Sequence, residues 1–334
     1  MKRLVISSII ILTLFACNKN TFNIDVEMTN ANGKVVYLQK IIDNEFVNVD
    51  SVLIKDNKAH FDVKKDDKNA YHIFIKGWRR ALPFFADNED VIIKGDFNNY
   101  NKINVTASET QELLNDFNSS FAQADDDAKK TLVLEIVENH PEKDLAPYVV
   151  YRYKWLFNLD ELRDIMSYFN DATSYTAKLN EYISFLERTD VGQPYIDFTM
   201  NNVDGQEVSL SDLVGDNELL MIDFWAAWCP DCRVENPNVV AVYNDFKDKG
   251  FDVISVSLDT DKNAWTKAIA DDNLSWENHV SELKGWDCSA AKEYGVAWIP
   301  QNVLLDIDGN IVAKNLNGND LRIFVENYLG GTDK

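Results

Sequence analysis

Two cysteines separated by two residues, Cys229 and Cys232, carry the clearest chemistry in this sequence. Two intervening residues allow a disulfide to close and reopen with little movement of the backbone. Residues 219–225 form a mostly apolar run, which predicts a strand buried on both faces of a sheet. Apolar residues then recur at helical spacing from Val234 to Phe246. We therefore expect a strand to give way to a helix at Cys229.

The expected position of Cys229 at a helix N-terminus favours its thiolate. Free N–H groups and the helix macrodipole stabilise negative charge there. Cys232 lies one turn further into the helix. This arrangement predicts thiol-disulfide exchange in which Cys229 attacks a target disulfide and Cys232 resolves the mixed disulfide. Such chemistry needs no cofactor beyond the redox-active disulfide itself.

Two other interpretations of the cysteine pair have to be weighed. Half of a zinc site has the same spacing, but tetrahedral zinc needs two more ligands, and the sequence has no second C-x-x-C and no H-x-x-x-H. We therefore expect no metal site. A purely structural disulfide is the other alternative, although a bridge that closes so short a loop constrains the unfolded chain little.

The segment around the cysteines resembles a known family. Residues 223–232 resemble the thioredoxin active site, and residues 233–237 resemble its continuation in the extracytoplasmic TlpA-like branch. Residues 192–199 and 204–213 are similar to the leader of AhpC/TSA and TlpA domains, and residues 294–309 to the proline loop and closing hairpin of the family. The resemblance covers residues 191–334. It implies a thioredoxin-like α/β fold and thiol-disulfide oxidoreductase activity.

Three more residues acquire roles through this resemblance. Asp223 matches the buried carboxylate that moves protons to and from the resolving cysteine, and burial should raise its pKa. Glu235 matches an acidic residue that TlpA-like domains place three positions after the second cysteine, but it can equally be an ordinary exposed helix residue. Pro300 matches the cis-proline that faces the disulfide, beside which Ile299 would offer backbone groups to an extended substrate. Gln301 stands where the family more often has threonine, which leaves the substrate preference open.

The residues around the cysteines bear on substrate and redox direction. Trp228, Pro230, Asp231 and Ile299 are the expected substrate contacts. Asp231 is anionic and disfavours the Cys229 thiolate, so we expect a reductase or isomerase rather than an oxidant. A thiol peroxidase of the AhpC/TSA type would have Thr or Ser where Ala226 stands. A non-enzymatic binding lipoprotein that uses the fold as a scaffold is the other alternative.

The N-terminus has the pattern of an export signal. Residues 1–16 begin with Lys2 and Arg3, continue through an apolar core too short for an ordinary membrane span, and end in a small residue. Residues 14–17 resemble a lipobox, in which Cys17 is lipidated and residues 17–21 form a tether; an ordinary signal peptide is the alternative. We therefore expect a lipid-anchored, periplasm-facing protein of the cell envelope. Its expected partners are envelope protein thiols and disulfides and an electron-donating membrane thiol reductase.

The net charge disfavours two classes of partner, and the cysteine count leaves one cysteine without an assigned role. The formal net charge is −22, and it becomes −24 when Lys2 and Arg3 leave with the signal. A surface this negative repels nucleic acid and anionic headgroups. Of the four cysteines, Cys288 is left over, and we expect it to be a small buried residue, with a regulatory or intermolecular thiol as the alternative.

Residues 22–107 predict a β-sandwich-like domain. Apolar and polar residues alternate through several short runs with turn signals between them, and Asn32-Gly33 predicts a hairpin turn. Residues 49–51 and 60–61 resemble an amino-terminal domain of unknown function that precedes TlpA-like domains in bacterial lipoproteins. We expect this domain to be a spacer or a recognition module.

Residues 108–190 change to helical periodicity. Ser108 and Gln111 form an expected capping box. Further helices are expected at 128–139, 147–156, 159–169 and 174–186. One of them is rich in aromatic residues, which favours core packing over a peptide-binding stripe; these residues are Tyr148, Tyr151, Tyr153, Trp155 and Phe157.

Overall fold

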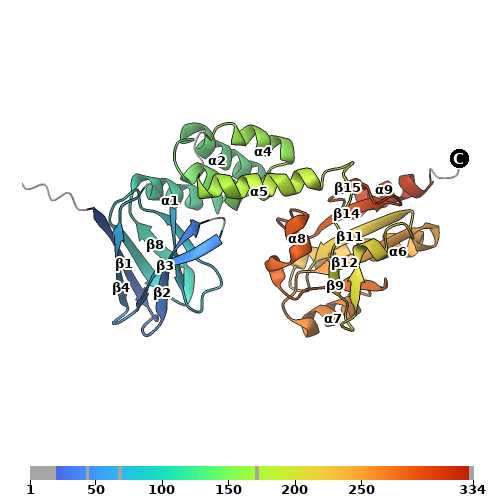
Figure 1. Ribbon diagram of the computed structural model, residues 1–334, viewed down its shortest axis with the longest axis horizontal. Helices are drawn as coiled ribbons and strands as arrows, with labels where there is room; N and C mark the ends of the chain where they lie inside the picture. The colour runs from blue at the N-terminus through green and yellow to red at the C-terminus, as the bar shows by residue number, and fades with distance from the viewer. Residues whose placement is uncertain (1–19, 43–44, 67–69, 170–172, 331–334) are drawn as a thin grey trace, which may run out of the picture. The chain divides into compact units, whose positions relative to one another are not determined.

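The computed structural model describes residues 20–42, 45–66, 70–169 and 173–330. The chain divides into two compact units, residues 1–146 and 147–334, which are described separately (Figure 1). The predicted signal peptide and Cys17 lie outside the described residues. Within the described part of the chain, no helix has the length and apolar character needed to cross a membrane.

The first unit contains the expected β-sandwich. One sheet has the order β4-β1-β7-β8 and the other β3-β2-β5-β6. The strands are β1 (Thr21–Thr29), β2 (Val35–Ile42), β3 (Glu45–Leu53), β4 (Lys58–Lys64), β5 (Ala70–Ile75), β6 (Leu82–Phe85), β7 (Val91–Asp96) and β8 (Asn99–Thr106). Alternate residues of β1, from Phe22 to Met28, are buried, as the period-two pattern predicts. These side chains form one core with residues from both sheets.

The prediction of a hairpin at Asn32-Gly33 is wrong. The turn is present and Gly33 has a φ of +77°, but β1 and β2 belong to different sheets. β1 pairs with β4 and β7, whereas β2 pairs with β3 and β5. The local turn signal is therefore correct, and the partners of the two strands are set by long-range packing.

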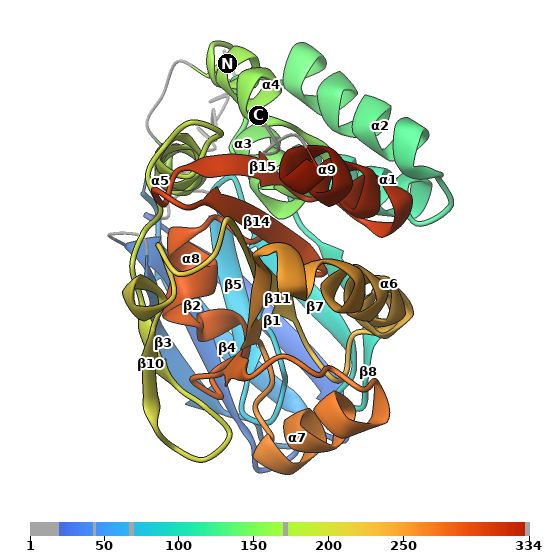
Figure 2. The ribbon, with the colours of Figure 1, turned by 90° about the vertical axis from the view of Figure 1, so that its right-hand side faces the viewer.

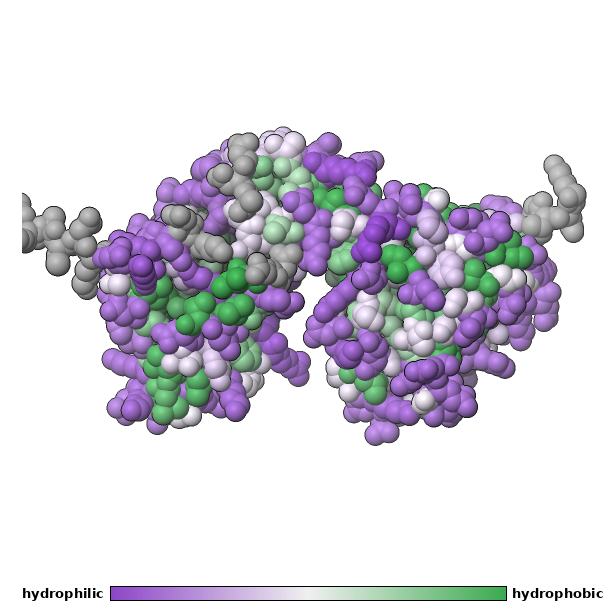
Figure 3. Space-filling view, in the orientation of Figure 1, coloured by the Kyte–Doolittle hydropathy of each residue, from purple (hydrophilic) through white to green (hydrophobic). Residues whose placement is uncertain are grey.

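Strand β3 leaves apolar side chains on the surface of the sandwich. Phe46, Val47, Val49 and Leu53 are exposed although they lie in a regular strand. β3 is at the edge of its sheet, and hydrophobic side chains are visible around it in Figure 3.

The helices of residues 108–190 lie where the periodicity predicts, with differences at their ends. They are α1 (Glu109–Phe121), α2 (Asp126–Asn139), α3 (Leu145–Arg152), α4 (Leu159–Met166) and α5 (Ser174–Arg188). Ser108 caps α1 by accepting a hydrogen bond from the Gln111 N–H, but the Gln111 side chain accepts from the Phe85 N–H at 3.0 Å instead of returning to Ser108. Only half of the expected capping box is therefore formed.

The aromatic segment is shorter as a helix than expected, because α3 ends at Arg152 and a 3₁₀ turn covers Lys154–Leu156. Tyr148 and Phe157 are buried, and the Tyr148 ring contacts the Tyr175 ring with centroids 5.1 Å apart. These contacts agree with core packing.

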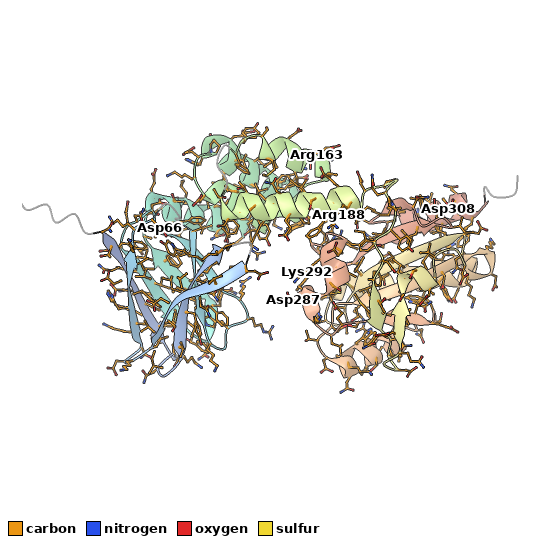
Figure 4. The ribbon with its side chains drawn as sticks, in the orientation of Figure 1. Asp66, Arg163, Arg188, Asp287, Lys292 and Asp308 are labelled. Carbon is orange, nitrogen blue, oxygen red and sulfur yellow. A yellow bond between two sulfur atoms is a disulfide. The ribbon has the colours of Figure 1, made fainter. Side chains whose placement is uncertain are left out.

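Helix α5 and the residue after it contact the C-terminal domain of the second unit, residues 191–334, which we call the redox domain. Arg163 of α4 pairs with Glu187 of α5 at 2.9 Å, and Arg188 pairs with Glu293 at 3.0 Å; Figure 4 labels both arginines. The Lys314 ammonium also donates to the Thr189 hydroxyl at 3.3 Å.

The redox domain is built on a five-stranded sheet of order β13-β12-β11-β14-β15 (Figure 2). Its strands are β11 (Leu219–Trp225), β12 (Phe251–Ser257), β13 (Asn278–Val280), β14 (Gln301–Asp306) and β15 (Ile311–Lys314), and a hairpin of β9 (Thr199–Asn201) and β10 (Glu207–Ser209) precedes them. Its helices are α6 (Pro230–Phe246), α7 (Lys262–Asp271), α8 (Ser289–Glu293) and α9 (Gly318–Gly330). β11 runs parallel to β12 and antiparallel to β14. All seven residues of β11 are buried, which confirms the expected central strand.

Candidate active site

The redox centre is a disulfide between Cys229 and Cys232 at the junction of β11 and α6. Cys229 is the N-cap of α6, and the Cys232 N–H points at its Sγ at 3.1 Å. Both cysteines are buried, with exposed fractions of 4 % and 0 %. The predicted strand-to-helix junction is therefore confirmed. The sulfur of Cys229 faces the backbone N–H groups of the first helical turn, which favour a thiolate once the disulfide opens.

The proline loop lies against the disulfide. The Ile299–Pro300 peptide bond is cis, as the resemblance implies. The Ile299 carbonyl oxygen is 3.6 Å from Cys229 Sγ. The proline loop, with the predicted residues Ile299 and Pro300, thus reaches the redox centre, although Ile299 and Cys229 are 70 residues apart along the chain.

Gln301 holds the backbone of the proline loop. Its Oε1 accepts hydrogen bonds from the Ala297 N–H at 2.9 Å and the Trp298 N–H at 3.4 Å. Its Nε2 donates to Asn315 Oδ1 at 3.0 Å, and the residue is buried. Gln301 stands where the family more often has threonine. Its side-chain amide links the backbone of the proline loop to Asn315, the residue that follows β15.

We expect Gln301→Ala to destabilise the redox domain by about 1–3 kcal/mol, because it removes a buried side chain that accepts from two backbone N–H groups and donates to Asn315. Thermal unfolding of the oxidised protein measures this loss. Gln206→Ala is the matched control, since the Gln206 side chain is exposed on the β9–β10 turn. Equal melting temperatures for the two variants would contradict the role given to Gln301.

Asp223 is buried in the middle of the sheet, as predicted. It is 4 % exposed, and its Oδ2 accepts a hydrogen bond from the Ser255 hydroxyl at 3.0 Å. Ser255 in turn accepts from the Trp276 indole N–H at 3.0 Å. Burial raises the pKa of Asp223 to about 7; the Ser255 hydrogen bond opposes this shift and the charge of Glu235 adds to it. This direction agrees with the predicted raised pKa, and the transfer of protons to Cys232 stays a prediction.

Glu235 is held by two neighbours. Its Oε1 accepts from the Gly318 N–H at 2.6 Å, and its Oε2 accepts from the Asn238 amide at 3.1 Å. The carboxylate therefore joins α6 to the start of α9, and its charge reaches Asp223. Its side chain is half-buried, which differs from the ordinary exposed helix residue of the alternative interpretation.

Three exposed tryptophans surround the redox centre. Trp228 precedes Cys229, Trp298 precedes Ile299, and Trp286 belongs to a 3₁₀ turn at Gly285–Asp287. Their exposed fractions are 52 %, 36 % and 47 % for Trp228, Trp298 and Trp286. The rings of Trp228 and Trp286 are 6.3 Å apart between centroids. Pro230 and Asp231 are exposed next to them, so the predicted substrate contacts lie on an accessible aromatic surface.

Asp259 is a site residue that the sequence analysis missed. It is 2 % exposed, and its Oδ2 accepts from the Ala227 N–H at 2.9 Å and from the Ser257 hydroxyl at 2.8 Å. It therefore fixes the loop that precedes Cys229. Its position directly after the buried run of β12 is the only signal that the sequence offers, because the contact with Ala227 depends on the parallel pairing of β11 and β12.

The remaining cysteine lies in the core of the second unit. Cys288 is a free thiol, 1 % exposed, and burial raises its pKa. It is thus buried as expected. No group of three or more His, Cys, Asp or Glu side chains within the described part of the chain could hold a metal ion.

A helix-capping disulfide opposite a cis-proline, on a mixed sheet with this strand order, defines a thioredoxin-fold redox protein. Residues 191–314 match the AhpC/TSA family, and residues 22–114 match a domain of unknown function, DUF4369. The thiol-disulfide oxidoreductase ResA of Bacillus cereus (strain ATCC 10987 / NRS 248) is 27 % identical over 148 residues, which cover 44 % of this chain and 82 % of ResA.

Two solved structures are more similar in sequence. The thioredoxin domain of a thiol-disulfide oxidoreductase from Bacteroides vulgatus is 37 % identical, with 42 % of this chain and 98 % of that chain covered and a TM-score of 0.39. A thiol:disulfide interchange protein from Bacteroides sp. is 35 % identical, with 43 % and 93 % covered and a TM-score of 0.40. Residues 191–314 are therefore a domain of the AhpC/TSA family that is similar to thiol-disulfide oxidoreductases, and a DUF4369 domain precedes it.

Proposed function

We propose that this protein is a lipid-anchored, extracytoplasmic oxidoreductase that reduces or isomerises disulfides of envelope proteins through the Cys229/Cys232 dithiol. The observation that carries the proposal is the disulfide at the N-terminus of α6, 3.6 Å from the carbonyl oxygen of Ile299. The export signal and Cys17 of the sequence support the location.

The reaction begins with the reduced dithiol. The Cys229 thiolate attacks one sulfur of a target disulfide, forms a mixed disulfide with it and releases the other target sulfur as a thiolate. Cys232 then loses its proton and attacks Cys229 Sγ, which closes the enzyme disulfide and releases the second target thiol. The target gains two electrons and the enzyme loses two. In isomerisation, a second target thiol attacks the mixed disulfide instead, and the enzyme leaves reduced.

Asp223 is the proposed proton acceptor for Cys232. A carboxyl with a pKa of about 7 can accept and return a proton near neutral pH. Glu235 supports this role by raising the pKa of Asp223. Both carboxylates therefore act on the resolving step.

The exposed surface around the disulfide is the proposed substrate-binding surface. The Ile299 backbone would pair with an extended target segment, and Trp228, Pro230 and Asp231 would flank it. Asp231 disfavours the Cys229 thiolate, which supports reduction or isomerisation over oxidation. A membrane thiol reductase would return electrons to the dithiol.

A trapping experiment with the Cys232→Ser variant tests the proposal. Without the resolving thiol, Cys229 should remain joined to its target, so adducts that disappear on reduction should appear in the envelope fraction on a non-reducing gel. The double variant Cys229→Ser with Cys232→Ser is the matched control and should form none of these adducts. If the single variant gives the same pattern as the double variant, the proposal is wrong.

A further inference from the structure

A cavity opens beside the redox loop of the second unit. It has a volume of about 450 Å³ and lies between the loop before Cys229, the segment after β12 and helix α7. We call it the Trp228 pocket; its lining includes Trp228, Arg233, Asp259, Asp261, Lys267 and Asp271. Since Trp228 is the chain neighbour of Cys229, the pocket lies within reach of a polypeptide whose sulfur reacts at Cys229.

The charges of the Trp228 pocket do not balance. Arg233 is held by Asp272 through hydrogen bonds of 2.5 and 2.6 Å, and Lys267 pairs with Asp271 at 2.5 Å. Both lining cations are therefore already paired. Asp259 and Asp261 form no ion pair within 4.0 Å among the described residues, although the charge of Asp259 does reach Arg233. The lining carries three carboxylates, Asp259, Asp261 and Asp271, against two cations, so the pocket keeps an excess of negative charge.

Asp259 has an unused acceptor in this pocket. Its side chain is almost completely buried, and the hydrogen bonds from Ala227 and Ser257 both go to Oδ2. Oδ1 receives no hydrogen bond from any residue that the structure describes. A guanidinium or ammonium group would supply the missing donor and a compensating charge.

The wall formed by Trp228 suits the same ligand. Half of its side chain is exposed, while its indole N–H is fixed to the Leu258 carbonyl oxygen at 3.2 Å. A fixed indole face attracts a cation placed over it. The aliphatic stem of an Arg or Lys side chain would pack on Ala264 and Ala268, which also line the cavity.

We propose that the Trp228 pocket binds an Arg or Lys side chain adjacent to the reacting cysteine of the target polypeptide, and so selects target disulfides with a basic neighbour. The inference rests on the proposed function and specifies its substrate class. An acidic side chain at the same position would meet uncompensated carboxylates and is selected against.

Three disulfide-linked peptides that differ only in the residue next to the cysteine, Arg, Gln or Glu, test the proposal with the reduced full-length protein. We expect kcat/KM to fall in the order Arg, Gln, Glu, with roughly a tenfold step from Arg to Gln, the scale of a charge-assisted hydrogen bond. The ratio of kcat/KM between the Arg and Gln peptides should become smaller at high salt, because the pocket is open to solvent and salt screens its charges. Each peptide is made with the variable residue on either side of the cysteine.

The Asp261→Asn variant tests whether the preference for the Arg peptide arises in the Trp228 pocket. Asp261 caps α7 by accepting from the Asn263 and Ala264 N–H groups, and asparagine caps helices equally well, so the fold is kept while one charge is lost. We expect the Arg-to-Gln ratio of kcat/KM to fall at least about threefold. Thr260→Lys, which puts a competing ammonium group on the lining, should lower the same ratio. Asp308→Asn is the control. This exposed residue, labelled in Figure 4, lies in the β14–β15 hairpin just after Asp306, which pairs with the first residue of β11, whereas Cys229 follows the last residue of β11.

The outcomes separate this inference from the proposed function. Equal kcat/KM values for the three peptides would overturn the inference and leave the oxidoreductase activity in place. A preference for Arg that both pocket variants leave unchanged would overturn its assignment to the Trp228 pocket. If no peptide and no small disulfide is reduced, the proposed function itself fails.

Discussion

Replacing Cys229 with serine is expected to lower kcat/KM for disulfide reduction by at least about a thousandfold, the scale seen when a catalytic nucleophile is removed. A serine hydroxyl stays protonated at neutral pH and cannot form a mixed disulfide. The Cys229 sulfur is also the one that lies beside the proline loop, whereas Cys232 is completely buried. Release of thionitrobenzoate from an aromatic disulfide by the reduced protein measures the loss.

Cys288→Ser provides the matched control for this experiment. Cys288 is the free thiol of the described residues; it takes no part in the disulfide and is buried between the 3₁₀ turn and α8. Its substitution should leave the rate of reduction close to that of the unmodified protein. A Cys229→Ser variant that retains its rate, or a Cys288→Ser variant that loses it, would contradict the assignment of Cys229 as the nucleophile.

The residues near the cysteines were predictable because their structure is local. An unbroken buried strand followed by helical periodicity determines the junction at Cys229, and the same strand predicts the burial of Asp223. The cis bond before Pro300 and the role of the proline loop came from the family resemblance. Each of these features can be recognised in a short stretch of sequence, without knowledge of its contacts with distant segments.

The features that sequence reasoning missed depend on contacts between distant segments. Asp259 reaches Ala227 only because β12 lies beside β11, and Trp286 meets Trp228 only because a 3₁₀ turn folds against the end of β12. The partners of β1 and β2 follow the same rule, since the turn at Asn32-Gly33 carries no information about which sheet each strand joins. β13 has only three residues and gives no periodic signal.

The Asp223→Asn variant is expected to be more stable than the unmodified protein at alkaline pH. The pKa of Asp223 is about 7 in the folded protein and has the ordinary carboxyl value of 3.8 when the protein is unfolded. Between these values the folded state holds a proton that the unfolded state has lost, so stability falls as pH rises through this window. Between pH 5 and pH 8 the fall is roughly 2–3 kcal/mol. Asparagine keeps an acceptor for Ser255 but does not titrate, so this contribution disappears.

Urea unfolding of the oxidised proteins at pH 5 and pH 8, followed by tryptophan fluorescence, measures the difference. Six of the eight tryptophans lie in residues 191–334, so the signal reports mainly on the redox domain. The stability of Asp223→Asn relative to the unmodified protein should increase from pH 5 to pH 8, whereas Asp308→Asn should show no such increase. A constant difference across this range would mean that Asp223 does not carry the raised pKa.

The same substitution should slow turnover, because an amide cannot accept the proton of Cys232. General acid-base groups contribute roughly a hundredfold or more to rate, so a loss of at least about tenfold is expected. The pH profile of reduction should also lose its inflection near the pKa of Asp223. The buried Asp223 carboxylate lowers the stability of the folded protein at neutral pH. Its use as the proton acceptor in the resolving step explains why the site contains it. A variant that gains stability and keeps its rate would separate the two effects and assign Asp223 a structural role alone.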